Sequence, residues 1–155
     1  MNKPNLKPIG IKDVHFGENV TVVEPANIYG CTIGDDVFIG PFVEIQKKVS
    51  IGKRTRVQSH TFICELVTIG DNCFIGHGVM FINDLFVNNE PARGDQTLWK
   101  MTNIGNNVSI GSNATILPIE ICNHVVIGAG SVVTKDIIKS GVYAGNPAKK
   151  IKDIE

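Results

Sequence analysis

The feature that most constrains the fold of this chain is an apolar residue that recurs about every six positions. Eight of these residues are isoleucines followed directly by glycine. Extending the same frame gives eighteen apolar positions, which we call leaders, with one interruption after the twelfth. They are Phe16, Val22, Ile28, Ile33, Ile39, Ile45, Ile51, Val57, Ile63, Ile69, Ile75, Phe81, Ile104, Ile110, Ile116, Ile121, Ile127 and Val133. A short repeat of this length is typical of a solenoid.

A small or β-branched residue stands two positions before most leaders, for example Val37, Val43 and Cys73. Two inward side chains at this spacing describe a short strand, because alternate residues of a strand point to one face. The glycine and polar residues between strands favour corners, where positive φ is tolerated. Three corners close a coil of 18 residues, and coils stack about 4.8 Å apart. The pattern therefore predicts an all-β parallel helix of about six coils, in one domain over residues 1–155.

Two hexads are one residue short, Ile28 to Ile33 and Ile116 to Ile121. In each of them a residue two positions before the next leader, Cys31 or Ile119, can still point inward. We therefore expect the missing residue to fall in a corner and the core to stay in register.

Composition excludes several classes of protein. Lys+Arg and Asp+Glu are both 15, a balance that argues against nucleic-acid binding. The longest apolar run is four residues, Val79 to Ile82, and residues 1–7 lack a signal-peptide core, so we expect no membrane span and a cytoplasmic protein. The four cysteines form no CxxC pair, so neither a zinc ribbon nor a redox motif is indicated, and we expect buried, reduced thiols.

The repeat is interrupted by about twenty residues between Ile82 and Asn103. A long excursion from a regular solenoid is usually functional or disordered. Leu85, Phe86 and Trp99 suggest that it packs against something, such as a neighbouring subunit. We predict a protruding loop at 84–103 and favour a functional role over an inert insertion.

The end of the chain carries signals for a short helix. In Gly145-Asn146-Pro147, asparagine is a candidate N-cap and proline suits the first helical turn. We therefore predict a C-terminal helix over residues 148–153 that covers the open edge of the last coil.

The [Ile/Val]-Gly-x-x-small-x repeat resembles the left-handed parallel β-helix of the hexapeptide-repeat acyltransferases, over about residues 14 to 150. The left hand comes only from this resemblance, since the general crossover rule favours the opposite hand. The resemblance implies acetyl coenzyme A as cosubstrate, no metal requirement, and a homotrimer with active sites at the subunit interfaces. Flat apolar faces on a solenoid also suit an oligomer.

Two late segments resemble the part of the family that receives the adenosine phosphate end of coenzyme A. They are residues 132–136, Val-Val-Thr-Lys-Asp, and residues 145–149, Gly-Asn-Pro-Ala-Lys. The resemblance implies that Lys135, Asn146 and Lys149 bind coenzyme A. We expect the backbone amides at Gly111 and Ala129 to contact the pantetheine, because small corner residues allow close approach.

Four further segments resemble one branch of the family, the nucleotide-sugar N-acetyltransferases of cell-surface glycan synthesis that act on 3-amino-3-deoxyhexoses. They are Phe42-Val43-Glu44-Ile45-Gln46, Gln58-Ser59-His60, Phe62-Ile63-Cys64-Glu65 and Phe81-Ile82-Asn83-Asp84.

This resemblance implies that Asn83 holds the sugar amine through its carbonyl oxygen. Asparagine cannot take a proton, so Asn83 would not be the base. The departing thiolate would then accept the amine proton, and Asp84 would orient Asn83 or the sugar. The same resemblance implies sugar or nucleotide binding by Glu44, Gln46 and His60. The simpler alternative is that Asn83 and Asp84 only form a corner.

The chain departs from the branch in one respect. Some members carry Pro-Arg soon after Asn-Asp, whereas the nearest match here is Pro91-Ala92-Arg93. The departure favours a neutral 6-deoxy sugar on a dTDP carrier over a UDP-linked uronic acid.

Three other functions remain open. Residues 104–150 also resemble sugar O-acetyltransferases of the galactoside and maltose type, which use a histidine, yet residues 84–103 contain none. Zinc chemistry of the γ-carbonic-anhydrase type needs three converging imidazoles, whereas His60 and His77 are 17 apart with no close third, so we expect no metal site. A non-catalytic scaffold would bind no coenzyme A and would tolerate replacement of Asn83.

Overall fold

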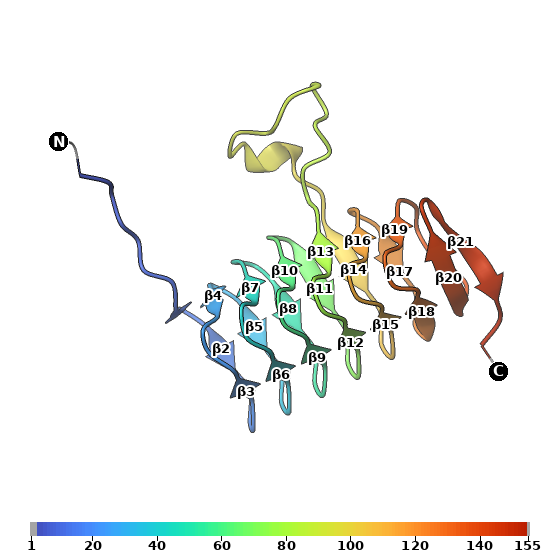
Figure 1. The fold of residues 1–155 in the computed structure, drawn as a ribbon, viewed down its shortest axis with the longest axis horizontal. Coiled ribbons are helices and arrows are strands. Elements are labelled where there is room, and N and C mark those ends of the chain that lie inside the picture. Colours follow the sequence, from blue (N-terminus) through green and yellow to red (C-terminus); the bar gives the residue numbers. More distant parts are fainter. Residues whose placement is uncertain (1–2, 155) are drawn as a thin grey trace.

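The chain folds into a parallel β-helix with three flat faces, shown in Figure 1. The computed structural model describes residues 3–154. The seven-stranded face contains β1 (Ile11–Lys12), β4 (Asn27–Tyr29), β7 (Glu44–Ile45), β10 (Phe62–Ile63), β13 (Met80–Phe81), β16 (Thr115–Ile116) and β19 (Val132–Val133). The six-stranded face contains β2 (His15–Phe16), β5 (Thr32–Ile33), β8 (Ser50–Ile51), β11 (Val67–Ile69), β14 (Thr102–Ile104) and β17 (Glu120–Ile121). The eight-stranded face contains β3 (Thr21–Val22), β6 (Phe38–Ile39), β9 (Arg56–Val57), β12 (Phe74–Ile75), β15 (Ser109–Ile110), β18 (Val125–Ile127), β20 (Gly141–Gly145) and β21 (Ala148–Lys152).

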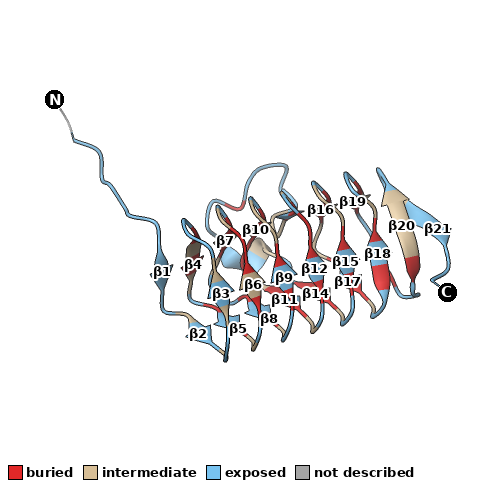
Figure 2. Cartoon of the chain, turned by 60° about the horizontal axis from the view of Figure 1, so that its bottom comes forward, coloured by how far each residue is buried: buried red, intermediate tan, exposed pale blue. Residues whose placement is uncertain are grey.

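The leaders form the core, as the repeat predicts. Each leader stacks on the leader of the next coil, for example Ile45 on Ile63, through parallel pairing of their strands. Sixteen of the eighteen leaders are buried; the exceptions are Phe16, which is 41 % exposed, and Val22, which is half-buried. Both belong to the first coils, where no full coil covers them. Figure 2 shows buried segments that recur from coil to coil along the helix, separated by intermediate and exposed residues.

Both short hexads keep the core in register. Cys31 and Ile119 are 3 % and 7 % exposed, so each points inward as expected. The prediction of six coils is low by about one. Ile11 pairs with Ile28 below the first leader, and Ile137 and Tyr143 continue the pairing beyond Val133. The six-residue spacing is not kept before Phe16 or after Val133, so counting hexads misses the strands that extend the helix at both ends.

The predicted C-terminal helix is wrong. Residues 148–152 form β21, which pairs antiparallel with β20, and Asn146 and Pro147 make the turn between them. β20 itself pairs parallel with β18, so its other edge would expose unpaired backbone groups. Pairing with this open edge outweighs the local signals for a helix, which fit the hairpin turn equally well.

The turns between faces stack into corners that carry the chemistry. Turns from the seven-stranded to the six-stranded face (46–49, 64–66, 82–101, 117–119 and 134–136) form what we call the loop corner. Turns from the eight-stranded to the seven-stranded face (40–43, 58–61, 76–79, 111–114 and 128–131) form the histidine corner. The predicted protruding loop is confirmed: it leaves the loop corner after β13, contains the 3₁₀ helix η1 (Gln96–Leu98) and returns at β14 (Figure 1).

The search for membrane-crossing helices covers residues 3–154. Within that range no helix has both the length and the apolar character needed to span a bilayer.

Two isoleucines on the seven-stranded face, Ile45 and Ile11, give a direct test of the core. Ile45 is 0 % exposed and Ile11 is 47 % exposed. Ile45→Ala should lower the free energy of unfolding in urea by about 2–5 kcal/mol, because it leaves a cavity in the isoleucine stack. Ile11→Ala should lower it by a small fraction of that amount. Equal losses would contradict the assignment of Ile45 to the core and of Ile11 to an open end.

Candidate functional site

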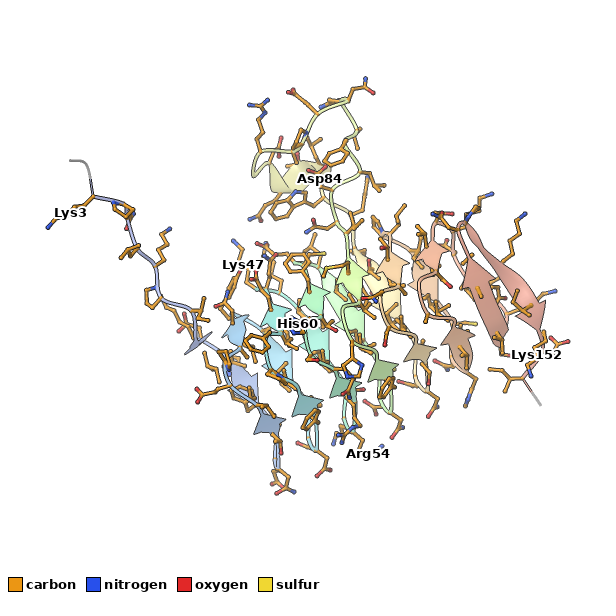
Figure 3. The ribbon with its side chains drawn as sticks, viewed as in Figure 1. Lys3, Lys47, Arg54, His60, Asp84 and Lys152 are labelled. Atoms are coloured by element: carbon orange, nitrogen blue, oxygen red, sulfur yellow. The ribbon has the colours of Figure 1, made fainter. Side chains whose placement is uncertain are left out.

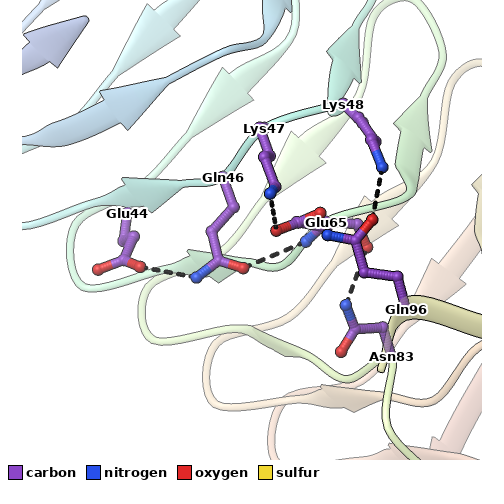
Figure 4. Close-up of polar contacts among 7 residues, drawn as sticks. All are labelled: Glu44, Gln46, Lys47, Lys48, Glu65, Asn83 and Gln96. Carbon is purple, nitrogen blue, oxygen red and sulfur yellow. Dashed lines mark hydrogen bonds and ion pairs between the residues drawn. The ribbon is translucent and has the colours of Figure 1, made fainter. Parts of the chain in front are cut away.

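One column of side chains runs along the loop corner. In successive coils the residue two positions after the leader is Lys47, Glu65 and Asn83, and the same register continues to Pro118 and Lys135. The protruding loop begins directly after Asn83. Figure 4 shows the polar contacts that link this column to the adjacent face. The loop that interrupts the hexad repeat therefore begins at the same column that carries these polar side chains.

Asn83 is held in one orientation by the coil before it. Its Nδ2 donates a hydrogen bond of 3.2 Å to the backbone carbonyl of Glu65. A carbonyl oxygen can only accept, so the amide nitrogen must face Glu65 and the Oδ1 atom must face away. Within residues 3–154 no donor is bonded to Oδ1. The Asn83 backbone carbonyl accepts from the amide of Lys100 at 2.9 Å, which closes the base of the loop. Asn83 thus presents a fixed, unoccupied acceptor.

Glu65 was not among the predicted site residues, although its segment belongs to the resemblance. Its carboxylate is buried beneath the loop corner. Oε1 lies 3.5 Å from Nζ of Lys47, and Oε2 has no hydrogen-bond partner within the described residues. A buried carboxylate oxygen without a partner is costly and marks a site under constraint. The sequence could have identified Glu65 as a site residue, because it precedes Asn83 by 18 residues, the length of one coil.

Glu44 and Gln46 connect the seven-stranded face to this column. Nε2 of Gln46 donates to Oε1 of Glu44 at 2.9 Å, and Oε1 of Gln46 accepts from the Glu65 amide at 3.3 Å. Tyr29 lies beside them: burial, followed by the charges of Glu44 and Glu65, raises the pKa of its phenol. The structure therefore brings three of the predicted residues, Glu44, Gln46 and Asn83, into one linked network.

Within the described residues the Asp84 side chain makes no hydrogen bond to the side chain of Asn83. Its Oδ1 accepts from the Phe86 amide at 2.9 Å and its Oδ2 from the Ala92 amide at 2.7 Å. Both oxygens therefore fold the loop back on itself. A hydrogen bond also joins the loop to the body of the β-helix: Nζ of Lys48 donates to Oε1 of Gln96 at 2.8 Å. The side chain of Asp84 shapes the loop that stands over the site.

His60 lies on the histidine corner, separated from Asn83 by the seven-stranded face. Its ring stacks on Phe42 with centroids 4.9 Å apart and planes inclined by 15°. Figure 3 shows Lys47 and Asp84 towards the loop and His60 away from it. His77 shares the histidine corner, and neither His15 nor His124 lies on the loop corner. Asn83 has no histidine of its own chain on its corner.

The residues predicted to bind coenzyme A are divided among the histidine corner, the loop corner and the β20–β21 hairpin. Gly111 and Ala129 are adjacent on the histidine corner, and the β20–β21 turn with Asn146 lies near them, since the Gly145 amide donates to Oγ of Ser131 at 3.1 Å. A Cβ at Gly111 would clash with the Ala129 backbone, so coil stacking alone already requires this glycine. Lys135 lies on the loop corner, and Lys149 lies on β21 opposite Ala144. The structure does not bring the two lysines together.

The thiols near the site are poor nucleophiles. Burial raises the pKa of the Cys64 thiol to about 12 and that of Cys31 to about 11. A thiol at these values is protonated at neutral pH and cannot attack a thioester. Across residues 3–154 no group of three His, Cys, Asp or Glu side chains is placed to hold a metal ion.

The sequence matches two family descriptions. "Bacterial transferase hexapeptide (six repeats)" matches residues 30–65, and "Hexapeptide repeat of succinyl-transferase" matches residues 66–80 and 101–135. Among curated proteins, the bifunctional protein GlmU of Clostridium botulinum is 36% identical over 129 residues, covering 82% of this chain and 26% of that protein. Galactoside O-acetyltransferase of Escherichia coli is 34% identical over 129 residues, covering 79% of this chain and 64% of that protein. The chain thus spans between a quarter and two thirds of these relatives.

Solved structures share the fold. A point mutant of AntD, an N-acyltransferase from Bacillus cereus in complex with dTDP and coenzyme A, superposes with a TM-score of 0.64. It is 25% identical, and the match covers 91% of this chain and 84% of that chain.

The raised thiol pKa values predict selective alkylation. At pH 8 iodoacetamide should leave Cys31 and Cys64 unmodified in the native protein, because their thiolate fractions are minute. The half-buried Cys122 should react first. Mass spectrometry of native and urea-denatured samples measures this difference. Modification of native Cys64 at the denatured rate would contradict its burial beside the site.

Proposed function

Because this chain belongs to the hexapeptide-repeat acyltransferases, we propose that it transfers the acetyl group of acetyl coenzyme A to the amine of a nucleotide-linked 3-amino-deoxyhexose. A dTDP-linked 3-amino-3,6-dideoxyhexose used in cell-surface glycans is the proposed acceptor. The AntD complex supports both the acyl donor and the nucleotide carrier by analogy. Among the residues of this chain, the Asn83 side chain gives the main support for the proposal.

The geometry of Asn83 suits an amine acceptor. Nδ2 of Asn83 donates to the Glu65 carbonyl, so Oδ1 is the atom that faces the substrate. An amide oxygen accepts hydrogen bonds, and a neutral amine can donate one to it. That hydrogen bond would fix the direction of the nitrogen lone pair and hold it against the reacting carbonyl, an advantage of positioning. When bound, acetyl coenzyme A supplies the thioester, and its departing thiolate can accept the amine proton. The chain then needs no side-chain base, which agrees with a loop corner free of histidine.

The other predicted residues surround this point. Glu44 and Gln46 would contact the sugar or its nucleotide. Glu44 lies on β7 between the two corners, and Gln46, at the start of the loop corner, links it to the Asn83 column. Lys135, two coils beyond Asn83 in the same column, and Lys149 would attract the phosphates of coenzyme A. Gly111, Ala129 and Asn146 would lie along the pantetheine from the other corner.

The polarity of the three faces supports the proposal of a homotrimer. The six-stranded face presents only polar residues outward: His15, Thr32, Ser50, Thr68, Asn103 and Glu120. The other two faces present apolar residues outward, among them Phe62, Met80 and Val132 on one and Phe38, Phe74 and Val126 on the other. Burial of these two faces against copies of the chain, with sites between subunits, removes that apolar surface from water.

A sugar O-acetyltransferase is the second candidate, favoured by the identity with galactoside O-acetyltransferase. A thiol-release assay with acetyl coenzyme A across dTDP- and UDP-linked 3-amino sugars, with matched hydroxyl sugars, separates the two. The proposal predicts turnover with the amino sugars. Turnover only with hydroxyl acceptors would establish the second candidate, and no release with any acceptor would favour a scaffold.

Replacement of Asn83 tests its role directly. Asn83→Ala should lower kcat/KM by roughly 30- to 1,000-fold, the usual loss when a transition-state contact is removed. Asn103→Ala, on the polar face, serves as the matched control and should change little. His60→Asn and His77→Asn should each cost less than Asn83→Ala.

The opposite pattern would contradict this mechanism. If one histidine substitution abolished turnover and left both KM values unchanged, that histidine would be the general base and Asn83 a corner residue.

The lysine assignments predict a change in affinity for the donor. Lys135→Glu with Lys149→Glu should raise the KM for acetyl coenzyme A, because two phosphate-attracting charges are reversed. The pair Lys139→Glu and Lys152→Glu alters net charge equally and should leave this KM near the wild-type value. An unchanged KM in the first pair would remove both lysines from the donor site.

A further inference from the structure

Phe42 occupies a backbone conformation that suits other residues better. It lies on the histidine corner with φ of 60°, in the left-handed region that Asn, Asp and Gly tolerate and bulky residues avoid. The equivalent positions of later coils hold His60, which has a φ of 62°, and then Gly78, Asn113 and Gly130. The Phe42 side chain is also 57 % exposed, so core packing does not account for it. Strained residues of this kind are concentrated at binding sites.

A groove opens beside the exposed ring. It has a volume of about 230 Å³ and is lined by Phe42, Ile9, Pro25, Asn27 and Glu44, among others. His60, from the following coil, stacks on one face of the ring. The lining residues Pro25 and Asn27 come from the preceding coil, so the groove lies on the opposite side. One ring face is thus braced while the other borders a cavity.

Two polar groups at the groove present complementary hydrogen bonds. Oε1 of Glu44 accepts from Gln46, which leaves Oε2 as a free acceptor. Oδ1 of Asn27 accepts a long bond of 3.4 Å from the Gly10 amide, which leaves Nδ2 as a donor. Asn27 and Glu44 are direct partners on neighbouring strands β4 and β7. The groove therefore offers one acceptor beside one donor, next to an aromatic face.

We propose that this groove binds a pyrimidine base with an imide edge, thymine or uracil, stacked on Phe42. The imide N–H would donate to Glu44 and a ring carbonyl would accept from Asn27. Cytosine presents a lone pair where Glu44 needs a donor, so it fits poorly. This inference rests on the proposed function, because the base would belong to the nucleotide carrier of the acceptor sugar.

The position of the groove relative to Asn83 matches such a carrier. Asn83 lies two coils from Phe42 along the axis, about 10 Å, and five residues further around the coil, about 16 Å of extended chain. The diagonal starts beside Glu44 and crosses the next coil at Phe62, the partner of Glu44 on β10. This span is comparable with an extended sugar joined through a diphosphate to a nucleoside. The amine could then reach Oδ1 of Asn83 while the base stacks on Phe42.

Binding of nucleoside diphosphates by isothermal titration calorimetry tests the site without turnover. The wild-type protein should bind dTDP and UDP at least 10-fold more tightly than CDP. Phe42→Asn, chosen because asparagine tolerates the corner, should weaken dTDP binding by roughly 10- to 100-fold through loss of stacking. Phe16→Asn removes another partly exposed ring, at the open end of the six-stranded face, and should leave dTDP binding unchanged. Glu44→Gln should reduce the preference for UDP over CDP.

Several outcomes would overturn the inference. These are equal affinity for UDP and CDP, undiminished dTDP binding by Phe42→Asn, and absence of nucleotide binding by the wild-type protein. Acetyl transfer to a dTDP-linked amino sugar with an unchanged KM in Phe42→Asn would reject this site and leave the proposed function intact. Phe42-dependent binding of dTDP without any acetyl transfer would keep the site and reject the proposed function.

Discussion

The structure depends on parallel pairing between strands of two or three residues, stacked coil upon coil around a column of isoleucine and valine. Each strand is too short to be stable alone, and it persists because its backbone bonds to both neighbouring coils while its leader fills the interior. Stacking identical registers also places every corner residue above its counterpart from the preceding coil. The core therefore fixes which polar side chains meet on the outside.

This arrangement separates stability from chemistry. The inward positions repeat the same apolar types, whereas the corner residues differ from coil to coil, apart from glycines such as Gly111 that close stacking requires. The loop corner uses that freedom to stack Lys47, Glu65 and Asn83 and to insert a long loop held by Asp84 and Lys48. The histidine corner uses it to display Phe42 on His60. Function on such a fold arises from columns of residues spaced by about 18 positions.

The sequence predicted the features that follow from the six-residue spacing. It predicted little of the structure at the ends of the β-helix or of the side-chain contacts at the corners. The leaders, the two short hexads and the protruding loop follow from spacing alone. The hairpin β20–β21 could not be found this way, because Asn146-Pro147 suits a helix start and a turn alike and an unpaired edge decides between them. Residue resemblance pointed to Asn83, but the orientation of its amide depends on the Glu65 carbonyl, a contact between coils. The strain at Phe42 likewise exists only in the folded backbone.

In the proposed mechanism Asn83 holds a neutral amine, and no imidazole of the enzyme takes the amine proton. The pH dependence of kcat/KM for the amino sugar tests this most directly. This mechanism predicts a single ionisation, that of the acceptor amine, with the same midpoint in the wild-type protein, His60→Asn and His77→Asn. A second limb near the pKa of an imidazole that one of these substitutions removes would contradict it.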